Sequence, residues 1–308
     1  CESVLAKQTV RFMRNEGEPS DRGKADAPWM AWVCFARPHQ PYTPSEPFAS
    51  MYNPDSIFLP PTADTDNELF RKSRSDRGEA EIRKILSIYL GLVSQVDYGI
   101  GMIIEELEKR GELDNTIIVY TTDHGDYAGE HSGFEKCGGI STRAITRIPL
   151  IVSYPELVKR NLSCAGLVES IDIFPTLCEL SGINIPDTVQ GMSFKSLLQG
   201  DTEAIRNDCI TENPYRKAIT TEKWRYVANL PDERDELYDQ ENDPWELYNL
   251  IDDPEYAEIA RRLCRRLFHR TAQARKPVHT LNGFWHNQEY DRAGLINLNK
   301  CGPITPYW

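Results

Sequence analysis

Three short apolar runs separated by a helical pattern constrain the fold of this chain most. The runs are "WMAWVCFA" (29–36), "TIIVYTT" (116–122) and "IPLIVSYP" (148–155). Continuous apolar runs of this length are typical of strands buried on both faces. Between the first two runs, apolar residues recur at three- and four-residue steps over 79–110, which predicts a long amphipathic helix ending near Gly111. This alternation predicts an α/β fold with a mainly parallel sheet sandwiched by helices.

The pattern changes at about residue 205. "KAITTEKWRYVANL" and "DELYD" indicate antiparallel strands, and "EYAEIARRLCRRLFHRTAQ" indicates a helix with a basic face. We therefore predict two parts: residues 1–204 as an α/β domain, and residues 205–308 as a small α+β subdomain with antiparallel strands.

Charge and hydropathy exclude some classes of partner. The formal net charge is −12, from 35 basic and 47 acidic side chains, which argues against a nucleic-acid partner because such binding needs a basic face. A small anionic substrate stays compatible, since local charge governs its binding. The sequence has no run of 18 apolar residues, so we predict no membrane span. The sequence does not fix a compartment.

The stretch "TTDHGDYAGEH" (121–131) carries the densest ionisable chemistry, and it follows a predicted strand. Asp123 and His124 are adjacent, and Gly125 would permit a turn that lets both reach one ion. Asp suits hard divalent cations and His suits several metals. His39 follows the predicted strand 29–36, and Lys136 lies in the loop before the predicted strand 148–155. In open α/β sheets, functional sites gather at the carboxyl ends of the strands. Taken alone, each residue also has a structural interpretation. Asp123 fits a turn, His39 fits a proline-rich loop and Lys136 fits a solvated surface position.

Five segments, in order, resemble the sulfatase family of the alkaline-phosphatase superfamily, over its C-terminal two-thirds. These segments are "RPHQPYTP", "DNTIIVYTTDHGDYAGEH", "GFEKCGGISTRAITRIPLIVSYP", "VESIDIFPTLCELSGINIPDTVQGMSFKSLLQG" and "ELYDQENDPWELYNLIDDPEY". The resemblance implies an incomplete alkaline-phosphatase-like fold. It also implies cleavage of a sulfate ester by a formylglycine nucleophile with a divalent cation, usually calcium in this family.

The resemblance implies a role for each matching residue. Asp123 and His124 match half of the metal site. Lys136 matches a lysine that contacts the sulfate and the nucleophile, and His39 matches a histidine that hydrogen-bonds the sulfate or the leaving oxygen. These groups would stabilise charge on the sulfuryl oxygens.

The first departure from the family is the lack of its N-terminal site motifs. No C/S-x-P-x-R nucleophile motif is present, and the only Asp-Asp pair, Asp252–Asp253, is better explained as a helix N-terminus. We therefore expect the nucleophile and the remaining metal ligands upstream of residue 1, on a missing N-terminal segment that acts as a partner. The chain alone is expected to be inactive and to expose apolar surface and unpaired strand edges.

A second departure lies after Lys136, where "ISTRAIT" replaces the Y-E segment of the family. This makes Arg143 and Arg147 candidates for substrate contacts, with pairing to a carboxylate as the alternative for each. The substrate would be a small anionic sulfate ester of a sugar, an aryl alcohol or choline.

Three functions remain open from the sequence. The leading one is sulfuric ester hydrolysis. The second is hydrolysis of phosphonate monoesters or phosphodiesters in the same superfamily, for which Mn²⁺ or Zn²⁺ would also suit the site. The third is a non-catalytic binding protein with a relic site.

Overall fold

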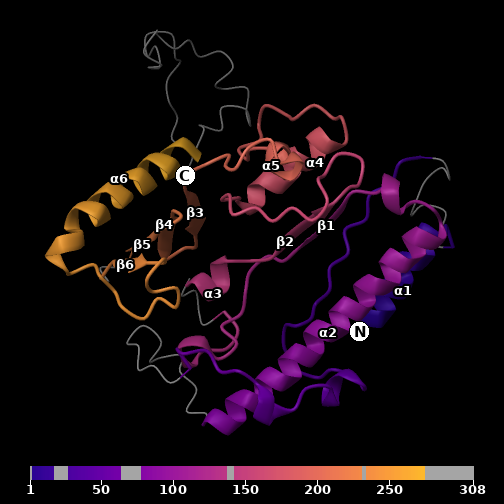
Figure 1. Ribbon diagram of the computed structural model, residues 1–308, viewed down its shortest axis with the longest axis horizontal. Helices are drawn as coiled ribbons and strands as arrows, with labels where there is room; N and C mark the ends of the chain where they lie inside the picture. The colour runs from indigo at the N-terminus through magenta and orange to yellow at the C-terminus, as the bar shows by residue number, and fades with distance from the viewer. Residues whose placement is uncertain (1, 17–26, 64–77, 137–141, 231–233, 275–308) are drawn as a thin grey trace, which may run out of the picture. The chain divides into compact units, whose positions relative to one another are not determined.

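The computed structural model describes residues 2–16, 27–63, 78–136, 142–230 and 234–274 (Figure 1). Internal contacts divide the chain into two compact units, Cys1–Leu250 and Ile251–Trp308, and each is described by itself. The boundary that the sequence predicts at residue 204 stays a prediction. The expected loop-like C-terminal residues lie outside the described residues, except for the end of the last helix.

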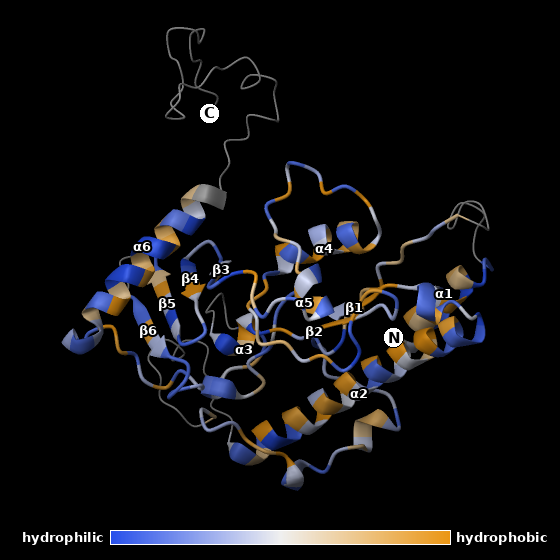
Figure 2. Cartoon of the chain, turned by 45° about the horizontal axis from the view of Figure 1, so that its top comes forward, coloured by the Kyte–Doolittle hydropathy of each residue, from blue (hydrophilic) through white to orange (hydrophobic). Residues whose placement is uncertain are grey.

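The predicted helix over 79–110 is confirmed, and it packs on a helix at the start of the chain. Helix α1 spans Glu2–Met13 and α2 spans Glu79–Lys109. Ala6 and Met13 are buried in α1, and the apolar stripe of α2 includes the fully buried Leu92. An ion pair of 2.6 Å between Arg14 and Glu106 joins the end of α1 to the last turns of α2. Figure 2 shows apolar residues along both helices.

Helix α2 also has the length and composition of a membrane-crossing helix. It has 31 residues, and its most apolar window has a mean hydropathy of 1.3. This is weak evidence, because the core helix of a soluble protein passes the same test. Polar side chains on α2, those of Ser87, Gln95 and Glu106, are buried by the protein itself. The absence of a membrane span stays a prediction.

The apolar run 29–36 is not a strand in the structure, so this prediction is wrong for the described chain. The side chains alternate instead between half-buried and exposed positions. Trp29 packs edge-on against Phe12 of α1, with ring centroids 5.9 Å apart, and Phe35 lies against Gly99 of α2. Met30 and Trp32 are 72% and 79% exposed. The run is apolar because one side packs on helices, but a β-ladder also needs a neighbouring strand, and none of the described residues supplies one.

Strands β1 (Ile118–Thr121) and β2 (Leu150–Ser153) form a two-stranded antiparallel ladder. Thr121 lies opposite Leu150, so residues 122–149 leave and return at the same end of the pair. A connection of this kind gives an antiparallel pair, whereas parallel neighbours need a crossover to the other end. The ladders among the described residues are all antiparallel, so the parallel strands of the predicted α/β sheet are not seen in this part of the chain. Ile151 is 61% exposed, consistent with the expected exposure of apolar surface.

The predicted antiparallel strands of the C-terminal half are confirmed. Strands β3 (Cys209–Glu212), β4 (Arg216–Thr220), β5 (Trp224–Asn229) and β6 (Glu236–Asp239) form a sheet in sequence order (Figure 1). Ile219, Val227 and Leu237 are fully buried. Strand β3 was not predicted, because it is short and lacks a clear alternation.

Short helices complete the first unit: α3 (Arg143–Thr146), α4 (Ile173–Leu180) and α5 (Lys195–Gln199). The predicted stop of α4 near Gly182 is confirmed, since this residue has a φ of +68°. A buried ion cluster fixes this region to the start of β3. Arg206 pairs with Asp172 at 2.5 Å and with Glu169, whose carboxylate accepts the backbone N–H of Ile210.

The second unit contains a 3-10 turn, Pro254–Tyr256, and helix α6, Ala257–Ala274. The Asp253 side chain accepts the backbone N–H of Glu255 at 2.9 Å. This confirms that the Asp252–Asp253 pair marks a helix start rather than a metal site.

Candidate active site

Asp123 and His124 follow β1 directly and face each other. Nε2 of His124 lies 3.4 Å from Oδ2 of Asp123, and the backbone N–H of His124 donates to Oδ1 of Asp123 at 3.0 Å. The Asp123 side chain is 83% exposed. Partial desolvation alone would raise its pKa, but the neighbouring His124 charge, that N–H and the Thr122 hydroxyl outweigh it and lower the pKa. Asp123 is therefore an ionised, accessible oxygen ligand at neutral pH.

The ring of His124 is oriented by its own backbone neighbour. Nδ1 lies 2.7 Å from the Gly125 carbonyl oxygen, which only accepts, so Nδ1 carries a proton. The other nitrogen, Nε2, then faces a carboxylate oxygen. Two lone pairs at this separation need a proton or a cation between them.

The Asp123–His124 pair fits one side of a divalent cation site. Two ligand atoms at right angles around Ca²⁺, each about 2.4 Å from it, lie about 3.4 Å apart. Nε2 of His124 and Oδ2 of Asp123 are separated by this distance, 3.4 Å. Two ligands do not complete a calcium site, which takes about six to eight. Among the described residues there is no group of three or more His, Cys, Asp or Glu side chains that could hold a metal.

Gly125 is required for space rather than for a turn. A Cβ atom at this position would lie 1.9 Å from the carbonyl oxygen of Ala144. The backbone N–H of Gly125 donates to the carbonyl oxygen of Ile145 at 2.8 Å. Its φ is not among the positive values, which corrects our reason for this glycine. Helix α3 is thus packed directly against the loop that holds Asp123 and His124.

Asp126 organises the loop that leads to Lys136. Its Oδ1 accepts the backbone N–H groups of Ala128 and Glu135, at 2.8 and 3.0 Å. Ala128 and Phe134 pack on the buried cluster of α2 that contains Ile82. Lys136, the last described residue of the loop, is exposed. The loop therefore presents Lys136 at its end, and Asp126 holds the loop closed.

His39 lies in the loop that follows the apolar run 29–36, and it is exposed. Its Nδ1 lies 2.9 Å from the Gln40 carbonyl oxygen, so Nδ1 carries the proton and Nε2 is left available. Arg37 fixes the loop by donating to the carbonyl oxygens of His39, at 3.1 Å, and Pro41. Neither His39 nor Lys136 bonds to Asp123 or His124 in the described structure. Their role in one common site stays a prediction.

Arg143 and Arg147 both line a cavity of about 450 Å³. The guanidinium of Arg143 donates to the Pro244 carbonyl oxygen at 3.1 Å, and the exposed Arg147 has no ion pair with a described carboxylate. The remaining lining residues are Glu130, His131, Thr142, Ala144, Pro244, Trp245 and Glu246. Thr142 is 4% exposed, and its hydroxyl has no hydrogen-bond partner in the described structure. The cavity thus offers cations, an indole ring and an unused hydroxyl.

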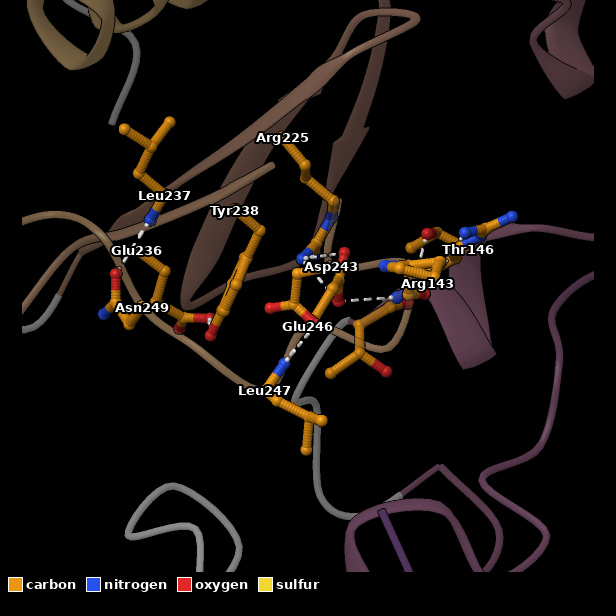
Figure 3. A network of polar contacts seen from close by, with 12 residues as sticks. Arg143, Thr146, Arg225, Glu236, Leu237, Tyr238, Asp243, Glu246, Leu247 and Asn249 are labelled. Carbon is orange, nitrogen blue, oxygen red and sulfur yellow. Dashed lines mark hydrogen bonds and ion pairs between the residues drawn. The ribbon is translucent and has the colours of Figure 1, made fainter. Parts of the chain in front are cut away.

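A buried network holds one wall of this cavity (Figure 3). Arg225 and Glu246 form an ion pair at 3.1 Å, with each side chain 1% exposed. Oε2 of Glu246 also accepts the backbone N–H of Arg143, at 3.0 Å. Asp243 accepts the backbone N–H groups of Leu247 and Tyr248. The start of α3 is therefore bound to a turn 103 residues further along the chain.

Two neighbouring groups at the cavity have opposite pKa shifts. Burial, with the charge of Glu246, raises the pKa of Glu130 to about 7. Burial lowers the pKa of His131 to about 4, against the charges of Asp243 and Glu236. Near neutral pH, His131 is uncharged and Glu130 is partly protonated.

Sequence reasoning missed most of the cavity. In the sequence, Glu130 and His131 fit a helix start or a turn, and Trp245 and Glu246 belong to the last of the five family-like segments. Polar residues accumulate in "GEH" and "DPWE", but nothing in the sequence indicates that these two stretches meet.

Comparison with known proteins identifies the family of the chain. The pattern that defines the sulfatase family matches residues 3–183, more than half of the 308 residues. The chain belongs to the sulfatase family. A second pattern, the C-terminal region of N-sulphoglucosamine sulphohydrolase, matches residues 129–273 of this sulfatase chain. The resemblance predicted from the five segments is confirmed.

Two relatives illustrate the similarity. The sulfatase chain is 28% identical to an arylsulfatase of Clostridium perfringens over 269 residues, 82% of the chain and 54% of the relative. It is 33% identical to an N-acetylglucosamine-6-O-sulfatase of Bacteroides thetaiotaomicron over 199 residues, 58% of the chain and 34% of the relative. The chain spans about half the length of the arylsulfatase and about a third of that of the N-acetylglucosamine-6-O-sulfatase.

Solved structures confirm the α/β fold class. One is an enzyme in complex with its substrate D-glucosamine-2-N,6-O-disulfate, with a TM-score of 0.75, 23% identity, and coverage of 90% of this chain and 70% of that one. Another is the phosphonate monoester hydrolase of Agrobacterium radiobacter, with a TM-score of 0.76, 24% identity, and coverage of 94% and 63%. The sulfatase family generally uses a divalent metal and formylglycine.

Proposed function

We propose that the protein hydrolyses sulfuric esters and that this chain supplies half of its active site. The observation that supports this most is the geometry of Asp123 and His124, whose facing donor atoms are 3.4 Å apart and suit one divalent cation. Membership of the sulfatase family gives the pair its reaction class.

The groups of this chain have separate roles in the proposal. Asp123 and His124 hold the ion, with Ca²⁺ expected first and Mn²⁺ or Zn²⁺ suiting a phosphodiesterase. When bound, the ion supplies Lewis-acid stabilisation of the sulfuryl oxygens. Lys136 places a positive charge beside the sulfate, and His39, as an imidazolium, donates a hydrogen bond from Nε2 to the sulfate or leaving oxygen.

The nucleophile is expected from outside the 308 residues. The sequence has no C/S-x-P-x-R motif, and a formylglycine on an N-terminal segment would supply the attacking oxygen. The ester link between sulfur and the alcohol oxygen would then break. The chain alone is accordingly proposed to be inactive toward sulfate esters.

The cavity next to α3 supports a saccharide as the alcohol part of the substrate. Trp245 offers an aromatic face, Thr142 an unused hydroxyl, and Arg143 and Arg147 two cations. This combination suits a hydroxyl-rich ring with an additional anionic group. Relatives that act on sulfated saccharides, such as the N-acetylglucosamine-6-O-sulfatase, favour the same class.

The test compares the native protein on three substrates: an aryl sulfate, a sulfated glucosamine and an aryl phosphodiester. We expect sulfate esters to turn over faster, and Arg147→Ala to raise KM for the saccharide sulfate while leaving the aryl sulfate unchanged. Faster turnover of the phosphodiester would favour the second candidate, which the likeness to a phosphonate monoester hydrolase supports. If the native protein shows neither turnover of any of these substrates nor tight metal binding, the third function remains, a non-catalytic binding protein with a relic site.

Peptide mass mapping of the native protein supplies the second test. A peptide with a C/S-x-P-x-R sequence whose first residue is converted to formylglycine is the expected result. A native protein without that peptide, and without a partner chain that carries it, would contradict the catalytic proposal.

A further inference from the structure

Helix α6 concentrates positive charge on an otherwise acidic chain. Its 18 residues contain five arginines and one glutamate, whereas the whole chain has a net charge of −12. Solvated surface helices usually intersperse both signs. The composition of α6 therefore indicates a binding partner of opposite charge.

The arginines occupy the exposed side of the helix. Ala260, Leu263 and Leu267 are buried, with at most 9% exposure, while Arg261, Arg262 and Arg265 are exposed. Residues 261 and 265 are one turn apart, about 6 Å along the axis, and 262 lies about 100° around it. Arg266 and His269, which are also exposed, extend the same face. We call Arg261, Arg262 and Arg265 the α6 arginine face.

One acidic group neutralises a small part of this face. Glu258 pairs with Arg261 at 2.6 Å, but the two side chains are 71% and 75% exposed. A pair this exposed contributes little and is easily exchanged for another anion. Among the residues that the structure describes, Glu258 is the carboxylate paired with these three arginines, and this pair can be exchanged for an external polyanion.

We propose that the α6 arginine face binds a sulfated polysaccharide and so anchors the protein to a polymeric substrate. The proposal rests on the proposed function, because sulfate esters are the anions on which the enzyme would act. A guanidinium matches the oxygens of a sulfate group as it matches those of a phosphate, and its charge does not titrate. Several charges repeated along a helix suit a repeating polyanion rather than a single small anion.

The other polyanions fit less well. A helix that lies on a membrane needs an apolar face open to the lipid, but the apolar residues of α6 are buried and only Phe268, at 70% exposure, is a large exposed hydrophobic. Duplex DNA is also a dense polyanion, with about one charge per 1.7 Å, but it carries no sulfate ester on which the proposed reaction could act.

The test measures binding of the native protein to dextran sulfate, with neutral dextran as the matched polymer. We expect binding that weakens steeply with salt, and an affinity at least about tenfold lower for R261S/R262S/R265S. The control variant K7S/K84S/R160S removes the same charge at exposed positions outside α6 and should bind like wild type. R261K/R262K/R265K, which keeps the charge, should retain most of the affinity.

Three results would overturn the inference: unchanged binding by the serine variant, an equal loss in the control variant, or tighter binding of phosphatidylserine vesicles or duplex DNA than of dextran sulfate. Turnover of a small aryl sulfate, measured in parallel, separates the two proposals. Intact dextran sulfate binding without turnover of any sulfate ester contradicts the proposed function alone. Normal turnover with no α6-dependent binding contradicts only this inference.

Discussion

The backbone N–H of Arg143 donates to the buried carboxylate of Glu246, 103 residues away in the sequence. The same carboxylate neutralises Arg225 on β5. One side chain therefore joins α3, which packs against the candidate metal loop, to the C-terminal sheet. The stability of this connection and the geometry of the site should respond together to mutation.

The first prediction concerns that ion pair. Arg225→Ala or Glu246→Ala leaves one buried charge without its partner, and should lower the free energy of unfolding by about 3–5 kcal/mol. Urea denaturation of the native protein measures it. The matched control is Glu105→Ala, which breaks an ion pair with Lys109 whose side chains are 60–62% exposed. The control should cost less than about 1 kcal/mol, and an equal cost at both sites would contradict the prediction.

The second prediction concerns Gly125. A methyl group here overlaps the carbonyl oxygen of Ala144, so Gly125→Ala should displace α3 from the metal loop. We expect the metal affinity to fall by about 10- to 100-fold, as for other changes to groups that orient ligands. Gly101→Ala is the control, since its new Cβ meets nothing within 4 Å in α2. It should stabilise the protein by about 0.5–1 kcal/mol. Unchanged metal binding in Gly125→Ala would show that the contact can relax.

The third prediction concerns the ion itself. Asp123→Asn and His124→Gln should each abolish tight Ca²⁺ binding in a calorimetric titration, and chelation should abolish turnover in the wild type. Because the Asp123 side chain is 83% exposed, its replacement should change the unfolding free energy of the metal-free protein by no more than about 0.5 kcal/mol. Asp114→Asn, at another exposed carboxylate, should leave both measurements unchanged. Wild-type affinity in both site variants would rule out this pair as ligands.

The fourth prediction concerns pH. The pKa of Glu130 is raised to about 7, so the folded state holds its proton more tightly than the unfolded state, and this contribution to stability is lost as pH rises from about 4.5 to 7. The pKa of His131 is lowered to about 4, so its contribution is lost as pH falls from about 6.5 to 4. The two slopes oppose each other between about pH 4.5 and 6.5.

Glu130→Gln removes one of these slopes. Stability of the variant should rise with pH up to about 6.5, and at pH 8 it should exceed that of the wild type by about 1–3 kcal/mol. Denaturation curves at half-unit steps from pH 5 to 8 test this. Parallel pH profiles of variant and wild type would mean that Glu130 titrates normally.

Local patterns predicted the helices well. The periodicity of α2, the glycine after it and the basic face of α6 are all encoded within a few turns, and each is confirmed. The run 29–36 failed because its apolar residues specify burial but not a ladder partner. Strand β3 was missed because four residues without alternation carry no local signal.

The candidate site likewise has one part that the sequence predicts and one part that it does not. The adjacency of Asp123 and His124 is visible in the sequence, and their facing donor atoms follow from it. The cavity is not visible, because its walls come from three separate segments that meet only in the folded chain. The role of Gly125 also depended on tertiary structure, since the atom that excludes a side chain belongs to Ala144.

Asp126 accepts N–H groups from near both ends of the loop that leads to Lys136. The residues between these ends are tied to the rest of the fold as well, because Phe134 packs on the buried cluster of α2 and the Ser132 hydroxyl donates to the carbonyl oxygen of Ala63 at 2.7 Å. A loop that is fastened both to itself and to the core behaves as a rigid arm. The position of Lys136 at its end is therefore set by the fold before any substrate arrives.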